Sequence, residues 1–195
     1  MKTVFFAITV AACFGLEVGA LTQFEQQFLD AHNTKRRGVS PTATNMRELK
    51  WSAELASVAQ NYANKCIWGH NENKYEEAPS FERVGENIAW RSGQTAPLDV
   101  VTNWDNEKNL FNYFSNSCTG DCSHYTQVVW AETEYVGCAV AHCSPLEGVN
   151  WDPAYYYVCN YGERGNMNGD RPYVNGSPCS QCPSGYTCND KLCSS

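Results

Sequence analysis

The stretch CSHYTQVVW, residues 122–130, places a cysteine and a histidine directly before a run of strand-like character. Apolar and polar side chains alternate over residues 125–130, which favours a β-strand because neighbouring side chains of a strand point to opposite faces. His124 stands at the start of this run. Taken alone, a histidine in such a place is more often structural than functional, so its role depends on the residues that accompany it.

The periodicity of apolar residues predicts the remaining elements of one main domain. Three helices and two further strands are expected, over residues 22–38, 52–66, 97–111, 135–141 and 155–161. The first helix opens with Thr22 and Glu25 in the arrangement of a capping box and ends near Gly38. Helices that flank a short sheet predict an α/β or α+β layered domain.

Residues 1–20 have the pattern of a secretory signal peptide. Lys2 precedes an apolar run that is too short to span a membrane, and small residues surround an expected cleavage after Ala20. Removing this segment also removes Cys13, which leaves ten of the eleven cysteines. An even number of cysteines in a secreted chain predicts a fully disulfide-bonded protein. The mature chain is therefore expected to be extracellular, without stable insertion in a membrane.

The mature chain divides further into a main domain, a linker and a cysteine-rich tail. The main domain covers residues 21–165 and is long enough for one hydrophobic core. Residues 166–178 are rich in turn formers and predict a linker, and residues 179–195 carry four closely spaced cysteines. The tail is short and poor in apolar residues, so we expect disulfides to hold it together and the main domain to fold without it. Its CSQC motif also fits a redox pair or half of a zinc ribbon.

The charge of the chain argues against two classes of function. The sequence has 14 basic and 21 acidic residues and a formal net charge of −7. An acidic protein is a poor candidate for binding nucleic acids or anionic membranes through charge. Aromatic residues are frequent, with six Trp, eleven Tyr and eight Phe. We expect some of them at a groove as well as in the core.

Four polar residues stand out near the ends of the predicted elements. Glu107 falls in the apolar stripe of the third predicted helix, where a buried carboxylate needs a partner such as a histidine or a metal ion. A wider stripe would instead place Glu107 at its edge. His70 follows the second helix, Glu86 follows an expected tight turn at Gly85, and His124 precedes the run described above. Layered folds gather clefts at the ends of elements, but the spacing alone does not bring these residues together.

Together these motifs resemble the CAP superfamily, which contains cysteine-rich secretory proteins, venom antigens and pathogenesis-related proteins. SHYTQVVW is similar to the first signature of that family and YYVCNYGERGNM to the second. FLDAHNTKRR, LKWSAELASVAQNYANKC and GENIAW follow the family pattern in the expected order, over nearly all of the mature chain. Ser123 stands where the first signature usually has Gly, and Glu163 where the second prefers Pro, Ala or Arg, which leaves the local loop geometry open.

The resemblance implies an α-β-α sandwich of the α+β class, with a central cleft and a short disulfide-rich C-terminal hinge. The family's tetrad of two histidines and two glutamates corresponds to His70, Glu86, Glu107 and His124. His70 and His124 would bind a metal ion, with zinc as the expected cofactor, because neutral imidazoles are good zinc ligands. Glu86 and Glu107 would support the rings by accepting their other N–H groups. Two histidines are a sparse set of ligands, so the expected affinity is modest and pH-dependent.

The resemblance also implies how the ten cysteines pair. The implied pairs are Cys66–Cys143, Cys118–Cys122, Cys138–Cys159, Cys179–Cys188 and Cys182–Cys193. The last two pairs belong to the hinge. Channel-blocking relatives carry a further cysteine-rich subdomain after the hinge, whereas this sequence ends at Ser195, so an ion-channel toxin is not expected.

Three functions of different classes remain open. A secreted, non-catalytic binding protein would take a sterol or another lipid against Phe111, Tyr113 and Phe114 in the loop before His124, although these side chains could also pack locally. A metal-dependent hydrolase would use the same histidines, but the sequence has no HExxH motif and no evident nucleophile, so no catalytic residue is assigned. A venom, salivary or reproductive effector would act on an extracellular protein receptor or an ion channel. Of these, we expect the secreted, non-catalytic binding protein.

Overall fold

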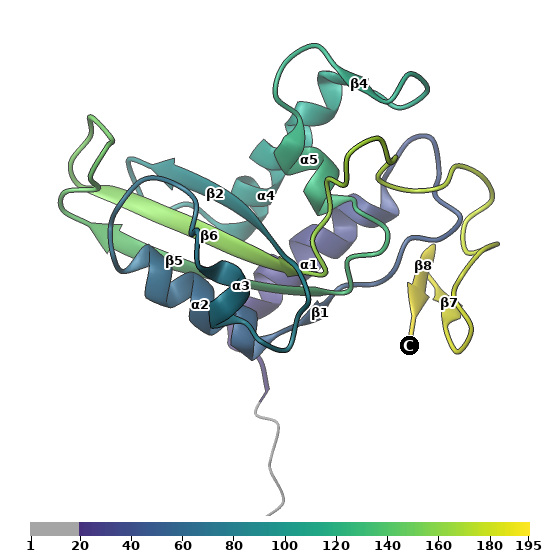
Figure 1. Ribbon diagram of the computed structural model, residues 1–195, viewed down its shortest axis with the longest axis horizontal. Helices are drawn as coiled ribbons and strands as arrows, with labels where there is room; N and C mark the ends of the chain where they lie inside the picture. Colours follow the sequence, from purple (N-terminus) through teal and green to yellow (C-terminus); the bar gives the residue numbers. More distant parts are fainter. Residues whose placement is uncertain (1–19) are drawn as a thin grey trace, which may run out of the picture.

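The computed structural model describes residues 20–195 and forms three layers, with a sheet between two layers of helices (Figure 1). Residues 1–19, which hold the predicted signal peptide apart from its last residue, lie outside the described residues. The helices are α1 (Gln23–Arg37), α2 (Ala53–Ala63), α3 (Lys74–Glu77), α4 (Pro97–Asp105), the 3₁₀ helix η1 (Asn106–Asn109) and α5 (Ser123–Val128). In the part of the chain that the structure covers, no helix is long and apolar enough to cross a membrane.

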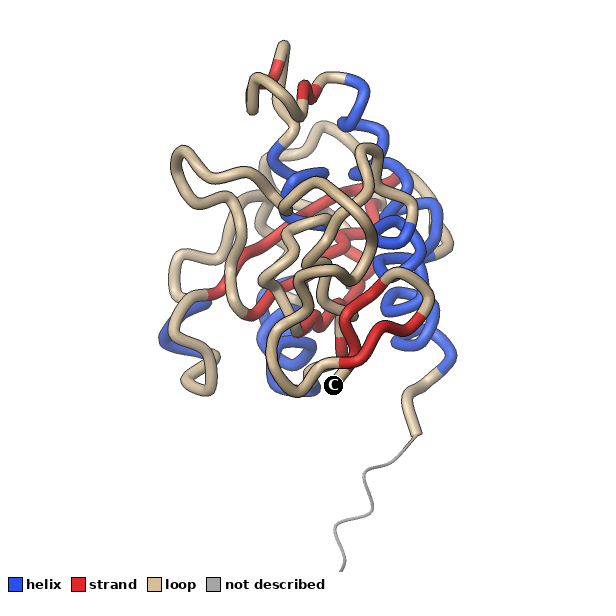
Figure 2. The backbone as a smooth tube through the Cα atoms, turned by 90° about the vertical axis from the view of Figure 1, so that its right-hand side faces the viewer, coloured by secondary structure: helices blue, strands red, loops and turns tan. Residues whose placement is uncertain are grey.

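The central sheet has four strands and is antiparallel apart from one pair. In sheet order the strands are β1 (Lys50–Trp51), β5 (Tyr135–Cys143), β6 (Ala154–Gly162) and β2 (Val84–Arg91), of which β1 and β5 run parallel. Two small hairpins pair β3 (Phe111–Asn112) with β4 (Ser117–Cys118), and β7 (Thr187–Asn189) with β8 (Leu192–Ser194). Figure 2 shows the strands of the central sheet lying between the two layers of helices. The predicted α-β-α sandwich of the α+β class is therefore confirmed.

The central strand β6 is buried on both of its faces. Tyr156 and Val158 belong to the core that includes residues of α2, whereas Tyr157, Cys159 and Tyr161 belong to the core beneath α1, α4 and α5. Successive side chains of a strand point to opposite faces, so one strand supplies both cores. This double burial explains why β6 reads as a nearly continuous apolar run.

Helix α1 begins as its sequence predicts and buries more of its length than expected. The hydroxyl of Thr22 accepts from the backbone N–H of Glu25 at 3.3 Å, and the Glu25 carboxylate accepts from the backbone N–H of Thr22 at 2.7 Å. Phe28, His32 and Arg36 follow at a spacing of four residues and are all buried. The apolar stripe therefore continues into a charged residue in the last turn.

One predicted element is wrong, and another is shorter than predicted. Residues 125–130 form most of α5 and the turn after it instead of a strand. All four residues from Tyr125 to Val128 are buried, so no solvent-facing side reveals whether the period is that of a helix or a strand. The third predicted helix ends at Asp105, and Glu107 lies in η1 and not in an apolar helical stripe.

Five disulfides brace the fold. They are Cys66–Cys143, Cys118–Cys122, Cys138–Cys159, Cys179–Cys188 and Cys182–Cys193. These are the pairs that the family resemblance implies. Cys66–Cys143 fastens the segment after α2 to the end of β5, and Cys138–Cys159 joins the neighbouring strands β5 and β6.

The cysteine-rich tail packs on the main domain more closely than its composition suggests. Leu192 and Cys193 are fully buried, and Leu192 belongs to the larger core cluster. The backbone N–H of Cys193 donates to the carbonyl of Met46 at 2.7 Å, and that of Glu48 donates to the carbonyl of Cys193 at 2.8 Å. One apolar residue of the tail, Leu192, therefore contributes to the core. That the main domain folds without the tail stays a prediction.

We expect Leu192→Ala to lower the free energy of unfolding by about 2–5 kcal/mol, because a fully buried leucine is replaced by a cavity. Urea denaturation of the oxidised protein measures this. Val174→Ala is the control, because Val174 lies on the path to the tail and is 46% exposed; its effect should stay below about 0.5 kcal/mol. Equal stability of Leu192→Ala and the unmodified protein would show that the tail does not contribute to the core.

Candidate functional site

The first histidine of the predicted tetrad is held by a buried carboxylate. Glu86 lies in β2, and its side chain is 1% exposed. Its Oε1 accepts from Nδ1 of His70 at 2.7 Å and from the backbone N–H of Asn71 at 3.0 Å. Because a carboxylate oxygen accepts, Nδ1 carries the hydrogen, and Nε2 of His70 keeps its lone pair. The His70 side chain is half exposed, so this lone pair is within reach of solvent.

The second histidine is held in the same way from another direction. Oε1 of Glu107 accepts from Nδ1 of His124 at 2.7 Å. Oε2 of Glu107 accepts from the backbone N–H groups of His124 and Tyr125, at 3.1 and 3.2 Å. Glu107 therefore caps the start of α5 while it orients the ring. The imidazole also stacks on the indole of Trp104, with ring centroids 6.1 Å apart and planes 19° apart.

The two pairs have the same pattern of hydrogen bonds. In each pair a glutamate accepts Nδ1–H of the ring and the backbone N–H of the residue that follows the histidine, Asn71 or Tyr125. Each backbone contact fixes the main chain beside the ring as well as the ring itself. The structure thus assigns the predicted tetrad to two separate pairs, His70 with Glu86 and His124 with Glu107. In a histidine that ligates a metal through one ring nitrogen, the other ring nitrogen usually donates its hydrogen to a carboxylate or a similar acceptor.

Strand β2 connects the two pairs. Glu86 binds His70, and the next residue, Asn87, donates from Nδ2 to the backbone carbonyl of His124 at 3.1 Å. Two consecutive residues of one strand therefore contact the segments of both histidines. The sequence did not predict this strand, because the buried polar residues Glu86 and Asn87 interrupt its apolar run.

Gly85 is required by the close approach of Gln127. A Cβ atom on Gly85 would lie 2.2 Å from Oε1 of Gln127. That oxygen accepts the backbone N–H of Gly165 at 2.9 Å, and Nε2 of Gln127 donates to Thr133 at 3.3 Å. The expected tight turn at Gly85 is wrong, because the residue lies within β2. Its missing side chain makes room for the amide that ties α5 to the segment after β6.

One cavity borders the first pair, and a second borders the residues just before His124. His70 and Glu86 line a cavity of about 230 Å³. Asp121 and Ser123, just before His124, line another of about 310 Å³, and Asn166 lines both. His70 therefore lies beside solvent-accessible space, and the second cavity reaches Ser123, the residue before His124.

The loop before α5 presents one of its three predicted contact residues. Phe111 and Tyr113 are partly buried and pack against the core, and Tyr113 stacks on Tyr173 with ring centroids 4.9 Å apart. Phe114 is 74% exposed. Tyr113 and Phe114 line a third cavity, of about 710 Å³. The structure therefore favours local packing for two of these aromatic residues and leaves Phe114 available.

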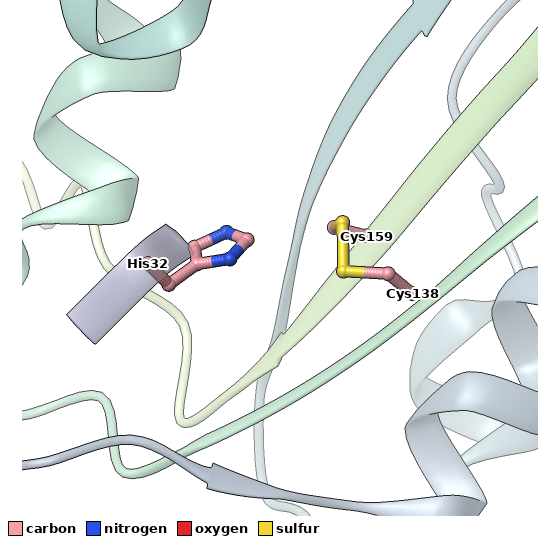
Figure 3. Close-up of side chains that lie close together, drawn as sticks. All are labelled: His32, Cys138 and Cys159. Atoms are coloured by element: carbon pink, nitrogen blue, oxygen red, sulfur yellow. A yellow bond between two sulfur atoms is a disulfide. The ribbon is translucent and has the colours of Figure 1, made fainter. Parts of the chain in front are cut away.

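A third histidine lies near cysteine sulfurs but is not placed to bind a metal. Figure 3 shows His32 beside the disulfide between Cys138 and Cys159. A disulfide has no thiolate to offer. Both ring nitrogens of His32 are engaged, at 2.8 Å from the carbonyl of Phe28 and 2.8 Å from the hydroxyl of Tyr161. The same argument applies to the tail cysteines 179, 182 and 193, which are also disulfide-bonded.

Comparison with known families decides the affiliation of the chain. The model of the CAP family, described as the cysteine-rich secretory protein family, matches residues 29–161. The chain belongs to the CAP family. It is 42% identical over 174 residues to GLIPR1-like protein 1 of Mus musculus, covering 88% of this chain and 72% of that protein. It is 43% identical over 181 residues to peptidase inhibitor 16 of Homo sapiens, covering 90% of this chain but only 37% of that longer protein.

Solved structures of CAP proteins share the fold. The crystal structure of NaASP2 with Zn2+ matches with a TM-score of 0.68 and 28% identity, covering 91% of this chain and 98% of that one. Venom allergen-like protein 4 of Schistosoma mansoni matches with a TM-score of 0.67 and 28% identity, covering 83% of this chain and all of that one. The CAP assignment therefore holds at the level of both sequence and fold.

Three residues that support this CAP site were missed at the level of the sequence. Asn87 and Gln127 hold α5 by hydrogen bonds, and Arg36 contacts its C-terminal end. Of the three, only Arg36 could have been predicted from the sequence, because it continues the four-residue spacing of Phe28 and His32 on the buried face of α1. The roles of the two amides depend on contacts between distant segments.

The buried His32 should make stability depend on pH. Burial lowers the pKa of His32 from 6.5 to about 4. The unfolded chain regains the ordinary value, so between pH 6.5 and 4 it binds more protons than the folded protein. The free energy of unfolding therefore decreases as the pH falls below 6.5. At pH 5 it is lower by about 2 kcal/mol than above pH 6.5 because of His32.

Urea denaturation at pH 7.5 and pH 5 measures this loss. His32→Asn should remove the part of the pH dependence that arises at His32, whereas His142→Asn, at an exposed position in β5, should leave it unchanged. The same difference in unfolding free energy between the two pH values in His32→Asn as in the unmodified protein would contradict the assignment.

Proposed function

We propose that this chain is a secreted, non-catalytic CAP protein that binds a divalent metal ion, zinc by preference, through Nε2 of His70 and Nε2 of His124. The observation that carries the proposal is the repeated design of the two pairs. Each ring is fixed through Nδ1 by a carboxylate at 2.7 Å, which leaves the other nitrogen as a free electron-pair donor.

The donor set fits a borderline metal ion. Imidazole nitrogen is a preferred ligand of zinc, and two rings leave positions for water or for an oxygen atom of a further ligand. The carboxylates of Glu86 and Glu107 orient the rings through their Nδ1–H groups and add negative charge close to the cation. The match to the structure of NaASP2 with Zn2+ supports zinc as the metal for this fold.

Other features support secretion and binding rather than hydrolysis. Five disulfides suit an oxidising compartment. Catalytic zinc sites commonly use three protein ligands, whereas this site supplies two imidazoles. Two of the relatives bear the names peptidase inhibitor 16 and peptidase inhibitor R3HDML, which denote inhibition and not hydrolysis. The chain spans about a third of the length of the first.

Zinc titration calorimetry tests the metal site. His70→Ala and His124→Ala should each remove most of the affinity, and the double substitution should add little, because one ion is lost in either case. Glu107→Gln should weaken binding by about tenfold, since the supporting charge is lost. A repeat at pH 5.5 should show weaker binding, because a protonated imidazole cannot ligate.

His142→Ala is the matched control, because it removes an exposed histidine from the far end of β5. Its zinc affinity should equal that of the unmodified protein. If His124→Ala also kept full affinity, the two histidines would not be joint ligands, and the proposal would fail.

The exposed ring of Phe114 favours a second function, the binding of a sterol or another apolar molecule. The cavity of about 710 Å³ beside it is in the size range of small-molecule sites. Trp130, Tyr173 and Val174 contribute to the same cavity. Its walls are held together, because Arg171 donates to the carbonyls of Tyr113 and Phe114 at 3.1 and 2.7 Å.

Phe114→Ala should weaken the binding of a fluorescent sterol by about tenfold, which corresponds to the lost burial of one aromatic side chain. Leu98→Ala is the control, because Leu98 in α4 is 52% exposed and does not line that cavity. Sterol affinity that is the same in both variants would exclude the loop as the sterol site.

A further inference from the structure

Asn87 connects the position of His124 to the interior of the protein. Asn87 is 2% exposed and lies in β2. Its Nδ2 donates to the hydroxyl of Tyr161 at 3.1 Å and to the backbone carbonyl of His124 at 3.1 Å. Both hydrogens of the amide are therefore donated, one to a side chain of the core and one to the backbone of the site.

The hydrogen bonds beyond Asn87 have a single consistent direction. A carbonyl can only accept, so Nδ1 of His32 carries the hydrogen that it shares with Phe28. Nε2 of the neutral ring then accepts from the hydroxyl of Tyr161, whose oxygen in turn accepts from Asn87. The donors and acceptors from His32 to the backbone carbonyl of His124 are thus assigned without conflict. A buried hydrogen-bond network with one consistent direction favours one arrangement of the groups that form it.

The backbone of Asn87 lies in a part of the sheet that is braced by a disulfide. In the sheet, Asn87 pairs with Cys159, and Cys159 pairs with Cys138 in the next strand, to which it is disulfide-bonded. His32 lies beside this disulfide (Figure 3). The amide of Asn87 therefore projects from a braced row of the sheet toward the second residue of α5.

We propose that Asn87 is a positioning residue that sets the direction of the His124 imidazole by holding its backbone. Glu107 fixes the ring through Nδ1, and Asn87 fixes the main chain from which the ring projects. Together they determine where Nε2 of His124 points. The inference rests on the proposed metal site, for which this direction decides whether both histidines reach one ion.

Asn33 offers a matched comparison for a purely structural asparagine. Asn33 is 5% exposed and makes two hydrogen bonds to the backbone of Leu49, at 3.0 and 2.8 Å. It is buried and hydrogen-bonded like Asn87, but it bonds to neither histidine of the site. Removing either amide should destabilise the fold, whereas only Asn87 should affect His124.

The experiment uses the full mature chain with Asn87→Ala, Asn87→Asp and Asn33→Ala. Zinc titration should show about tenfold weaker binding in both Asn87 variants and unchanged binding in Asn33→Ala. Asn87→Asp nearly preserves the shape but replaces the donor of two hydrogen bonds with an acceptor. Without zinc, the imidazole ¹H–¹⁵N signals of His124 should shift in the Asn87 variants, while those of His70 should stay in place.

The zinc-free spectra separate failure of this inference from failure of the metal site. If the unmodified protein binds no zinc, the proposed function is wrong, and the His124 signals alone decide the role of Asn87. If the Asn87 variants do not fold, Tyr161→Phe removes one anchor of the amide and should shift His124 in the same direction by less. Unchanged His124 signals in every folded variant, or an equal loss of zinc affinity in Asn33→Ala, would overturn the proposal.

Discussion

One buried guanidinium group, that of Arg36, joins the first helix to the segment on which the site depends. Its five N–H groups make six contacts of 2.7–3.3 Å to carbonyls, with one hydrogen of Nη2 shared between two of them. The carbonyls belong to Arg47, Val128, Trp130, Ala131 and Thr133. Burial lowers the pKa of Arg36 to about 9, so the group stays protonated at neutral pH. The partial negative charges of these carbonyls replace the water that the cation loses. Without them a buried charge of this kind would be strongly destabilising.

Arg36 makes the short helix α5 possible, and α5 carries His124. A helix of six residues is not stable by itself, because it has too few internal hydrogen bonds to offset its nucleation. Arg36 holds its C-terminal end, Glu107 accepts the N–H groups of its first turn, and Asn87 holds the carbonyl of His124. Three segments that are far apart in the sequence therefore decide the geometry of one imidazole.

This dependence explains which features the sequence could predict. Helix α1 has its own capping box and apolar stripe, so local signals were sufficient. In helix α5 the N-cap residue Cys122 makes no side-chain hydrogen bond, and the residues from Tyr125 to Val128 are all buried, so the apolar pattern does not distinguish it from a strand. Arg36 was overlooked because the run Lys35–Arg37 has the composition of a solvated last turn, although its spacing from His32 placed it on the buried stripe. A histidine or a metal ion was the expected partner of the Glu107 carboxylate, and His124 is that partner, although Glu107 lies in η1 and not in a longer α4.

The segment after β6 shows why composition alone cannot distinguish a solvated linker from a segment that packs on the main domain. Residues 166–178 are rich in turn formers. Several of them hydrogen-bond to the main domain. The side-chain oxygen of Asn166 accepts from Thr126 of α5 at 2.7 Å, and the carbonyl of Pro172 accepts from Ala131 at 2.7 Å. Polar and irregular residues suit both roles, since backbone and amide groups that would bind water in a linker bind the protein here. Asn166 and Pro172 also line the cavity that reaches Ser123, so the segment that leads to the disulfide-rich C-terminus forms part of the surroundings of the site.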